Sequence, residues 1–137
     1  MKFFIIIIFL FTKNIYSLEL KCFFEEVYQT GDMQKGFLLI KNDKLRYQYS
    51  SNRLYTIIHS QDLFYLIENK DKTKFIVINE KTEILQAVIK IIKDYPNFKE
   101  KYEINDFIIK TEKNTSNELI KRITVLSPDV NMSIYLI

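Results

Sequence analysis

The sequence predicts a mainly β domain of the α+β class, in which a strongly curved antiparallel sheet forms an incomplete β-barrel and one helix covers it as a lid. Strand-like segments separated by short polar turns recur about every ten residues, which is typical of an antiparallel meander that curls towards a barrel. One segment, residues 81–93, has helical spacing instead. The chain has 137 residues, of which 47% are hydrophobic, so it can bury the core of one domain.

The most informative strand-like segments form a hairpin over residues 35–49. In this hairpin an apolar strand (37–40) is followed by Lys41-Asn42-Asp43 and then by a second strand (44–49). Asn and Asp tolerate the backbone conformations of a tight turn. Because side chains alternate between the two faces of a strand, residues 37–40 are apolar on both faces and need cover on both. The other strands of this half are predicted over residues 20–29, 54–59, 63–68 and 73–79.

The helical segment is short and very apolar. Its apolar residues form one broad face, so we expect it to lie over the curved sheet. Asn79 or Thr82 can cap its start, and Pro96 prevents its continuation. A polar link then leads to three further strands, predicted over residues 106–111, 119–126 and 132–137.

Composition and charge exclude several classes of function. The formal net charge is +3 and the basic residues are scattered, which argues against a nucleic-acid surface. Cys22 is the only cysteine, so no intrachain disulfide can form. His59 is the only histidine, and its apolar surroundings in the sequence indicate an ordinary strand residue. We therefore predict no enzymatic activity, no catalytic residue, no metal site and no cofactor.

Residues 1–17 have the pattern of a secretory signal peptide. One basic residue precedes an apolar run (3–11), and a polar segment follows that ends in the small residue Ser17. As a helix the apolar run would span only about 14 Å, against about 30 Å of hydrocarbon, so it cannot cross a bilayer alone. Cleavage after Ser17 would leave a single domain, residues 18–137. An uncleaved anchor is the alternative, because Lys13 and Ile15 are unusual so close to a cleavage site.

A curled sheet that is apolar on both faces, together with an apolar helix, has more apolar surface than a small sandwich needs. We predict an apolar cavity for an acyl chain, since burial of each CH₂ group is favourable by about 0.8 kcal/mol. The alternative is an ordinary core in which the same side chains pack on one another. The predicted cavity residues are Phe24, Phe37, Leu39, Tyr47, Tyr49, Tyr65, Phe75 and Val77 from the strands, with Leu85, Val88 and Ile89 from the helix.

The hairpin at Gly36–Tyr49, GFLLIKNDKLRYQY, resembles the LolA family of periplasmic carriers of outer-membrane lipoproteins. In that family a hairpin of the form G-x-hydrophobic-…-R-P-G-K-L-R-W-x-Y follows a first strand of F-x-Q type, which Phe23–Gln29 loosely matches. Ile57–Leu66 stands in the place of the family's next hairpin, and the helix Thr82–Lys93 follows as it does in the family.

The resemblance implies a carrier that shields lipoprotein acyl chains in a lidded cavity and moves them across the periplasm towards the outer membrane. Its partners would be an inner-membrane ATP-driven releasing complex and an outer-membrane acceptor, and it would act as a monomer without nucleic acid. Lys41 would replace the family's lid-holding arginine as a weaker latch, because lysine lacks the planar fork of arginine. Arg46 would be a polar anchor beside Tyr47, and Leu45 is expected to contact a partner. The alternative is an exported, non-enzymatic envelope interaction module with a self-filled core.

Overall fold

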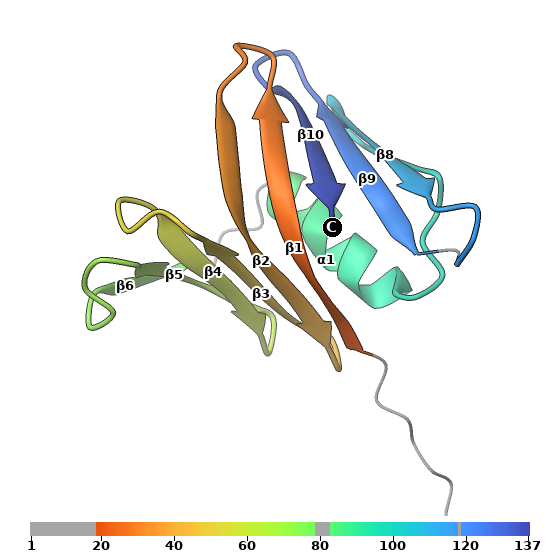
Figure 1. Cartoon of the computed structure of the whole chain (residues 1–137). Coiled ribbons are helices and arrows are strands. Elements are labelled where there is room, and N and C mark those ends of the chain that lie inside the picture. The colour runs from red at the N-terminus through yellow and green to blue at the C-terminus, as the bar shows by residue number, and fades with distance from the viewer. Residues whose placement is uncertain (1–18, 79–82, 118) are drawn as a thin grey trace, which may run out of the picture.

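The computed structural model describes residues 19–78, 83–117 and 119–137, and this part of the chain is mainly β (Figure 1). Among these residues ten antiparallel strands form one open sheet accompanied by one helix, which confirms the predicted β-rich class. The predicted signal peptide (1–17) and the two helix-cap positions, 79 and 82, lie outside the described residues. The elements are β1 (Glu19–Tyr28), β2 (Met33–Lys41), β3 (Lys44–Tyr49), β4 (Tyr55–Ser60), β5 (Leu63–Glu68), β6 (Phe75–Ile78), α1 (Glu83–Asp94), β7 (Lys101–Ile104), β8 (Phe107–Lys113), β9 (Ile120–Leu126) and β10 (Asn131–Leu136).

The sheet consists of two meanders that are joined in its middle. β1 to β6 pair in chain order, and so do β7 to β10, which gives the order β6-β5-β4-β3-β2-β1-β10-β9-β8-β7. The join is the antiparallel pair of β1 and β10, in which Phe24 faces Leu136 and Tyr28 faces Met132. Because β6 and β7 are at opposite ends of this order, the sheet is not closed.

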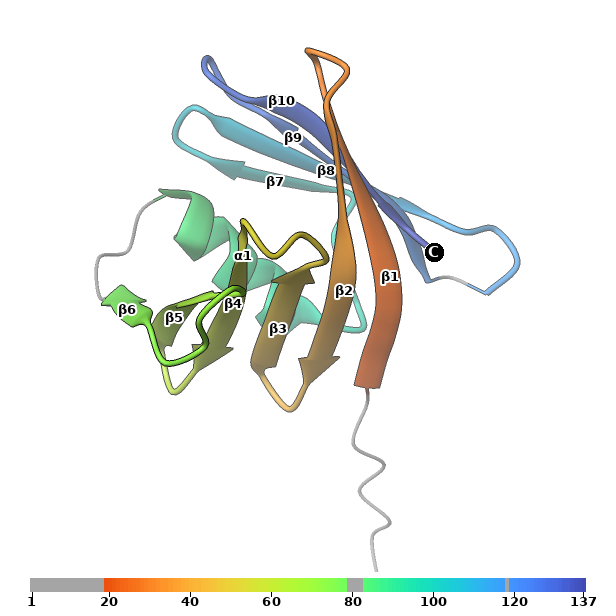
Figure 2. The ribbon, with the colours of Figure 1, turned by 60° about the vertical axis from the view of Figure 1, so that its left-hand side comes forward.

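The helix α1 connects the two edge strands, β6 and β7, and lies on the concave face of the curved sheet. Figure 2 shows α1 between the wing formed by β3 to β6 and the wing formed by β7 to β10. Ala87 is fully buried and, with Ile91, packs in a cluster with β7, β8 and β9, whereas Ile92 packs with β1, β2 and β3. The apolar face of α1 therefore joins the two halves of the core. The helix ends at Asp94, as expected for a chain with Pro96 so close.

Two-residue turns fix the register of the hairpins. Asn42 and Asp43, between β2 and β3, have φ values of 49° and 61°, and Gln61–Asp62, between β4 and β5, has the same left-handed conformation. A type I′ turn requires such values, and Asn and Asp adopt them more readily than most residues. Asn105 (φ 50°) lies in the turn between β7 and β8. The polar link expected before residue 106 contains a strand, β7, and its length of only four residues is too short to give a clear periodic pattern.

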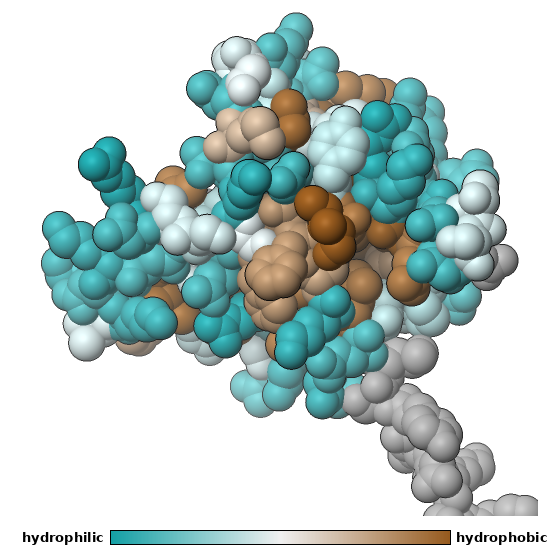
Figure 3. All heavy atoms as spheres, in the orientation of Figure 1, coloured by the Kyte–Doolittle hydropathy of each residue, from teal (hydrophilic) through white to brown (hydrophobic). Residues whose placement is uncertain are grey.

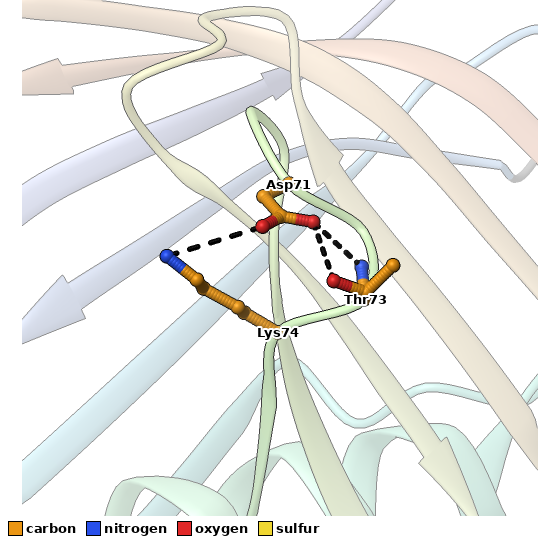
Figure 4. Close-up of polar contacts among 3 residues, drawn as sticks. All are labelled: Asp71, Thr73 and Lys74. Carbon is orange, nitrogen blue, oxygen red and sulfur yellow. Dashed lines mark hydrogen bonds and ion pairs between the residues drawn. The ribbon is translucent and has the colours of Figure 1, made fainter.

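The turn between β5 and β6 is held by Asp71. Its Oδ1 accepts hydrogen bonds from the hydroxyl (2.6 Å) and the backbone N–H (3.1 Å) of Thr73, while Lys74 Nζ lies 3.9 Å from Oδ2 (Figure 4). The hydrogen bonds from Thr73, the hydroxyl first, lower the pKa of the Asp71 carboxyl. These contacts are on the surface, so their part is to shape the turn that leads into the edge strand rather than to stabilise the core.

The convex face of the sheet carries an exposed apolar patch. Phe23 and Ile137 are 67% and 70% exposed, and they lie side by side because their backbones exchange hydrogen bonds of 3.2 and 2.9 Å. The rings of Phe23 and Phe37 meet edge to face with centroids 5.9 Å apart. Figure 3 shows apolar side chains gathered over β1 and the C-terminal end of β10 on this face. The expectation that residues 37–40 need cover on both faces is met on the concave side by α1, while the convex side is open to solvent around Phe23.

Candidate ligand-binding site

A cavity of about 330 Å³, called here the apolar cavity, lies between the concave face of the sheet and α1. Ligand pockets in proteins begin at about 300 Å³, so this volume suits one slender ligand. Its wall is apolar apart from one carboxylate, two tyrosine hydroxyls and a thioether. The lining residues are Glu26, Leu38, Ile40, Leu45, Tyr47, Tyr49, Ile57 and Phe64 from β1 to β5, Val88, Ile91 and Ile92 from α1, and Ile123, Met132, Ile134 and Leu136 from β9 and β10.

The register of the hairpin explains which side chains line the apolar cavity. The turn at Asn42–Asp43 pairs Ile40 with Leu45 and Leu38 with Tyr47. Paired residues of an antiparallel sheet point to the same face, so these four side chains all face α1. The next pairing places Ile57 opposite Tyr47 and extends the same face across β4.

A buried glutamate, Glu26, is the polar centre of the site. Its side chain is 2% exposed, and three tyrosine hydroxyls donate to it. Tyr47 donates to Oε1 at 2.5 Å, Tyr28 donates to Oε2 at 2.7 Å, and the Tyr49 hydroxyl lies 3.0 and 3.1 Å from the two oxygens. We call these four residues the Glu26 cluster. They come from β1 and β3, and β2 lies between these strands in the sheet.

The Glu26 cluster contains one carboxyl group and no basic side chain. Burial and the adjacent Glu26 raise the pKa of all three phenols, to about 12 for Tyr28 and further for Tyr47 and Tyr49. The tyrosines therefore stay neutral near pH 7 and supply hydrogen bonds without positive charge. Among the described residues, no Lys or Arg forms an ion pair with Glu26. Within this part of the chain the carboxylate is thus hydrogen-bonded but has no counter-charge.

Phe24 packs against two tyrosines of the Glu26 cluster. Its ring stacks on Tyr47 with centroids 4.0 Å apart and meets Tyr49 edge to face at 5.7 Å. Phe24 also lies opposite Gly36 in the sheet, where a Cβ on the glycine would come within 2.3 Å of the ring. The absence of a side chain at Gly36 therefore allows the ring to lie flat under Tyr47.

A second, more open hollow of about 740 Å³ adjoins the Glu26 cluster at the end of the sheet where the β1–β2 and β9–β10 turns lie. Tyr49 lines both this rim hollow and the apolar cavity. Two carboxylates, Asp32 and Asp129, line the rim hollow, and no basic residue does so within the described chain. Its lining residues are Tyr28, Gln29, Thr30, Asp32, Met33, Gln34, Tyr49, Leu54, Tyr55, Asp129, Val130 and Asn131.

The structure brings only some of the predicted cavity residues together. Tyr47, Tyr49 and Val88 line the apolar cavity, and Phe24 lies buried beneath Tyr47. Ile89 is half-buried outside the lining, and the side chain of Leu85 lies outside the described part of the chain. The expectation that the remaining residues face the same hollow is wrong, because the strand register places them on the convex face; they are Phe37, Leu39, Tyr65, Phe75 and Val77.

The predicted latch and partner residues also need correction. Lys41 pairs with Glu19 at 3.2 Å, and Arg46 hydrogen-bonds Gln48 at 2.6 Å. Lys41 and Arg46 lie on the convex face, away from α1, so neither is placed to hold the helix. Leu45 is 7% exposed and lines the apolar cavity, so its side chain does not form an exposed contact surface.

Sequence reasoning missed Glu26 and the contribution of β9 and β10. Glu26 was visible as a charged residue within an otherwise strand-like segment, but its burial depends on hydroxyls from β3. Ile123, Met132, Ile134 and Leu136 enter the lining because β10 pairs with β1, a contact between the two ends of the chain that no local pattern predicts.

His59 is another buried titratable residue of the described chain. His59 is 4% exposed and packs against Phe64, and neither ring nitrogen has a hydrogen-bond partner in the described structure. No group of His, Cys, Asp and Glu side chains that could hold a metal ion occurs among the described residues. Within that same part of the chain, no helix has the length and apolar character needed to cross a membrane.

No protein-family model matches this sequence, and a search of the curated proteins finds no match either.

Proposed function

We propose that this protein is a carrier that shields an acyl chain in the apolar cavity and moves it, as part of a lipid or lipoprotein, across the periplasm towards the outer membrane. The observation that carries the proposal is the apolar cavity itself, about 330 Å³ of unfilled space between α1 and the sheet. This partly open space is larger than the voids left inside a close-packed core, which supports the proposal over a self-filled core.

The energetics suit an acyl ligand. Each CH₂ group that leaves water gains about 0.8 kcal/mol, so a chain of roughly ten carbons gains several kcal/mol beyond the cost of its ordering. The wall contributed by α1, with Val88, Ile91 and Ile92, covers the concave side as a lid would. This arrangement supports the proposal that the fold is an incomplete barrel with a helical lid.

The resemblance of the Gly36–Tyr49 hairpin to the LolA family supports the transport role. On that resemblance the cargo would come from an ATP-driven complex of the inner membrane and would pass to an acceptor in the outer membrane. The predicted signal peptide supports the periplasm as the place of action. The corrected positions of Lys41 and Arg46 mean that the helix would have to be held by packing of Ala87 and Ile92 rather than by a basic latch.

The edge strand β6 favours a second function, an envelope interaction module. Phe75, Ile76 and Val77 are 59%, 62% and 41% exposed at the edge of the sheet. An exposed apolar edge strand can pair with a strand of another protein through its free backbone groups. This function needs no ligand, so binding of an acyl probe separates the two candidates.

The test is titration of the purified full-length protein with a fluorescent acyl probe that has an uncharged ester head. A matched pair of variants exploits two neighbours on β4 that are both half-buried. Ile57 faces the apolar cavity and Ile58 faces the other side of the sheet. The Ile57→Trp variant fills the cavity and should weaken probe binding at least tenfold, whereas Ile58→Trp should bind as the wild type does.

Circular dichroism of both variants confirms that each is folded before binding is compared. Absence of saturable probe uptake by the wild type would overturn the carrier function. Retained uptake by the Ile57→Trp variant would place the ligand elsewhere. Co-purification of an envelope protein that depends on Ile76, combined with no probe uptake, would favour the interaction module.

A further inference from the structure

We propose that the ligand is a single-chain amphiphile with an ammonium head group, and that Glu26 binds this head group where the apolar cavity meets the rim hollow. This inference rests on the proposed function, because the tail of the amphiphile would occupy the apolar cavity. It adds the chemistry of the head group and the residue that selects it.

The first argument is the missing counter-charge of Glu26. The carboxylate is 2% exposed and lines the apolar cavity, yet it is bonded only to phenols among the described residues. A buried carboxylate is costly unless it is both hydrogen-bonded and paired with a cation. An ammonium group supplies the opposite charge together with N–H donors, and it can approach along the cavity without displacing a protein cation.

The second argument is the character of the rim hollow. Asp32 and Asp129 line it, and no Lys, Arg or His does so in the described chain. Tyr28, Tyr49 and Tyr55 add aromatic side chains, whose faces attract cations. Because Tyr49 lines both hollows, a ligand with its tail in the apolar cavity would have its head beside Tyr49 and within reach of Glu26.

The charge of the whole protein would not explain a preference for an ammonium head group. The formal net charge is +3, so the protein as a whole has no excess of negative charge that would attract cationic ligands non-specifically. A carboxylate or phosphate head group would meet the negative charge of Glu26 in a place of low dielectric constant. Selection of an ammonium by this basic protein would therefore have to come from the site.

The test measures displacement of the neutral acyl probe from the full-length protein by three ligands with the same dodecyl chain, each below its micelle concentration. The ligands are dodecylammonium, a neutral dodecyl glycol ether and dodecanoate. We expect the wild type to bind dodecylammonium about tenfold more tightly than the neutral ether, in line with a charge-assisted hydrogen bond, and dodecanoate most weakly.

Two variants locate the preference. The Glu26→Gln variant should bind the ammonium and the neutral ether with affinities within about twofold of each other, because the amide keeps the shape but removes the charge. The control is Glu25→Gln, the next residue on β1, whose carboxylate points to the opposite face and pairs with Lys35 at 2.9 Å. This variant should keep the tenfold preference.

The outcomes separate this inference from the proposed function. Equal affinities of the wild type for the ammonium and the neutral ether would overturn the inference and leave the carrier function standing. A preference that persists in Glu26→Gln would also overturn it. Failure of all three ligands and of the neutral probe to bind would overturn both. Should Glu26→Gln fail to fold, the wild-type comparison still decides, since it needs no variant.

Discussion

The ring of Phe24 fills the space that a side chain on Gly36 would need. The two residues face each other across β1 and β2, and a Cβ built on Gly36 would lie 2.3 Å from Phe24 Cζ and 2.1 Å from the backbone oxygen of Gln48. Both distances are far below van der Waals contact. The stacking of Phe24 on Tyr47, and with it the position of the Glu26 cluster, therefore depends on glycine at this position.

The Gly36→Ala variant should lose about 2–3 kcal/mol of its free energy of unfolding, because the backbone at Gln48 and the Phe24 ring must both move to admit the methyl group. Urea unfolding followed by circular dichroism measures this loss. The matched control is Gly31→Ala, where nothing lies within 4 Å of the added Cβ but φ is +89°. Strain of the backbone alone should cost that variant about 1 kcal/mol. Equal losses in the two variants would contradict the steric explanation.

Asn69 anchors the loop between β3 and β4. Its side-chain N–H₂ group donates to the backbone oxygens of Tyr49 and Ser51, at 2.8 Å each, and its carbonyl accepts from the Thr56 hydroxyl at 2.7 Å. We expect Asn69→Asp to unfold more easily than Asn69→Ala, although aspartate is closer in shape. The alanine variant loses three hydrogen bonds, about 1–3 kcal/mol in all, whereas a carboxylate would also face two carbonyl oxygens without a donor.

Thermal unfolding of the two Asn69 variants at neutral pH measures the difference. Asn52→Asp, an exposed change in the same loop, is the control and should have little effect. Because protonation of the introduced carboxylate restores one donor, the gap between the aspartate and alanine variants should narrow at acid pH. An aspartate variant as stable as the wild type would show that the loop does not depend on these donors.

The strands were largely predictable from the sequence, whereas the site was predictable only in part. Alternating patterns and polar turns located the strands around Asn42 and Gln61, and helical spacing located α1. The prediction that Phe37 and Leu39 face the cavity was wrong, although the length of the turn is enough to predict the correct face. A two-residue turn at Asn42–Asp43 pairs Leu38 with Tyr47, so Phe37 and Leu39 must face away from Tyr47.

The remaining parts of the site depend on contacts between segments far apart in the sequence. Pairing of β1 with β10 brings Ile134 and Leu136 to the apolar cavity, and the burial of Glu26 needs hydroxyls from β3. Periodicity within one segment carries no information about either contact. The lack of a basic partner for Glu26 among the described residues could therefore be recognised only after the sheet was assembled.

The phenols of the Glu26 cluster make the free energy of unfolding depend on pH in the alkaline range. Burial and Glu26 raise the pKa of Tyr28 from 10.0 to about 12 and raise those of Tyr47 and Tyr49 as well. The unfolded chain then loses phenolic protons before the folded chain does, so the free energy of unfolding falls as pH rises above about 10. Urea unfolding at several pH values between about 9 and 12 measures this slope. Below the unfolded pKa the contribution is fully present.

Tyr47→Phe removes one of these phenols and should make the alkaline slope shallower, while lowering stability at neutral pH through the loss of a hydrogen bond to Glu26. Tyr55→Phe is the control, because Tyr55 is exposed and takes no part in the Glu26 cluster. A slope that is unchanged in Tyr47→Phe would contradict the assignment of the pH dependence to the cluster.

His59 is buried in the sheet with both ring nitrogens lacking a hydrogen-bond partner among the described residues, and it packs against Phe64 with ring centroids 4.7 Å apart. An unsatisfied buried polar group costs about 1–3 kcal/mol relative to an apolar group of similar shape. The His59→Leu variant should therefore be more stable than the wild type by about 1 kcal/mol, the rest being offset by imperfect packing. Urea unfolding measures the gain.

The control for His59→Leu is Thr56→Val on the same strand, which replaces another buried polar side chain by an apolar one. The Thr56 hydroxyl donates to Asn69 at 2.7 Å, so its removal should destabilise the protein by about 1 kcal/mol and leave the Asn69 carbonyl without that donor. Opposite signs for the two variants are expected, because one polar group is satisfied and the other is not. A loss of stability in His59→Leu would contradict the assignment of His59 as an unsatisfied buried group. Unchanged probe binding by the same variant would show that the imidazole takes no part in ligand binding.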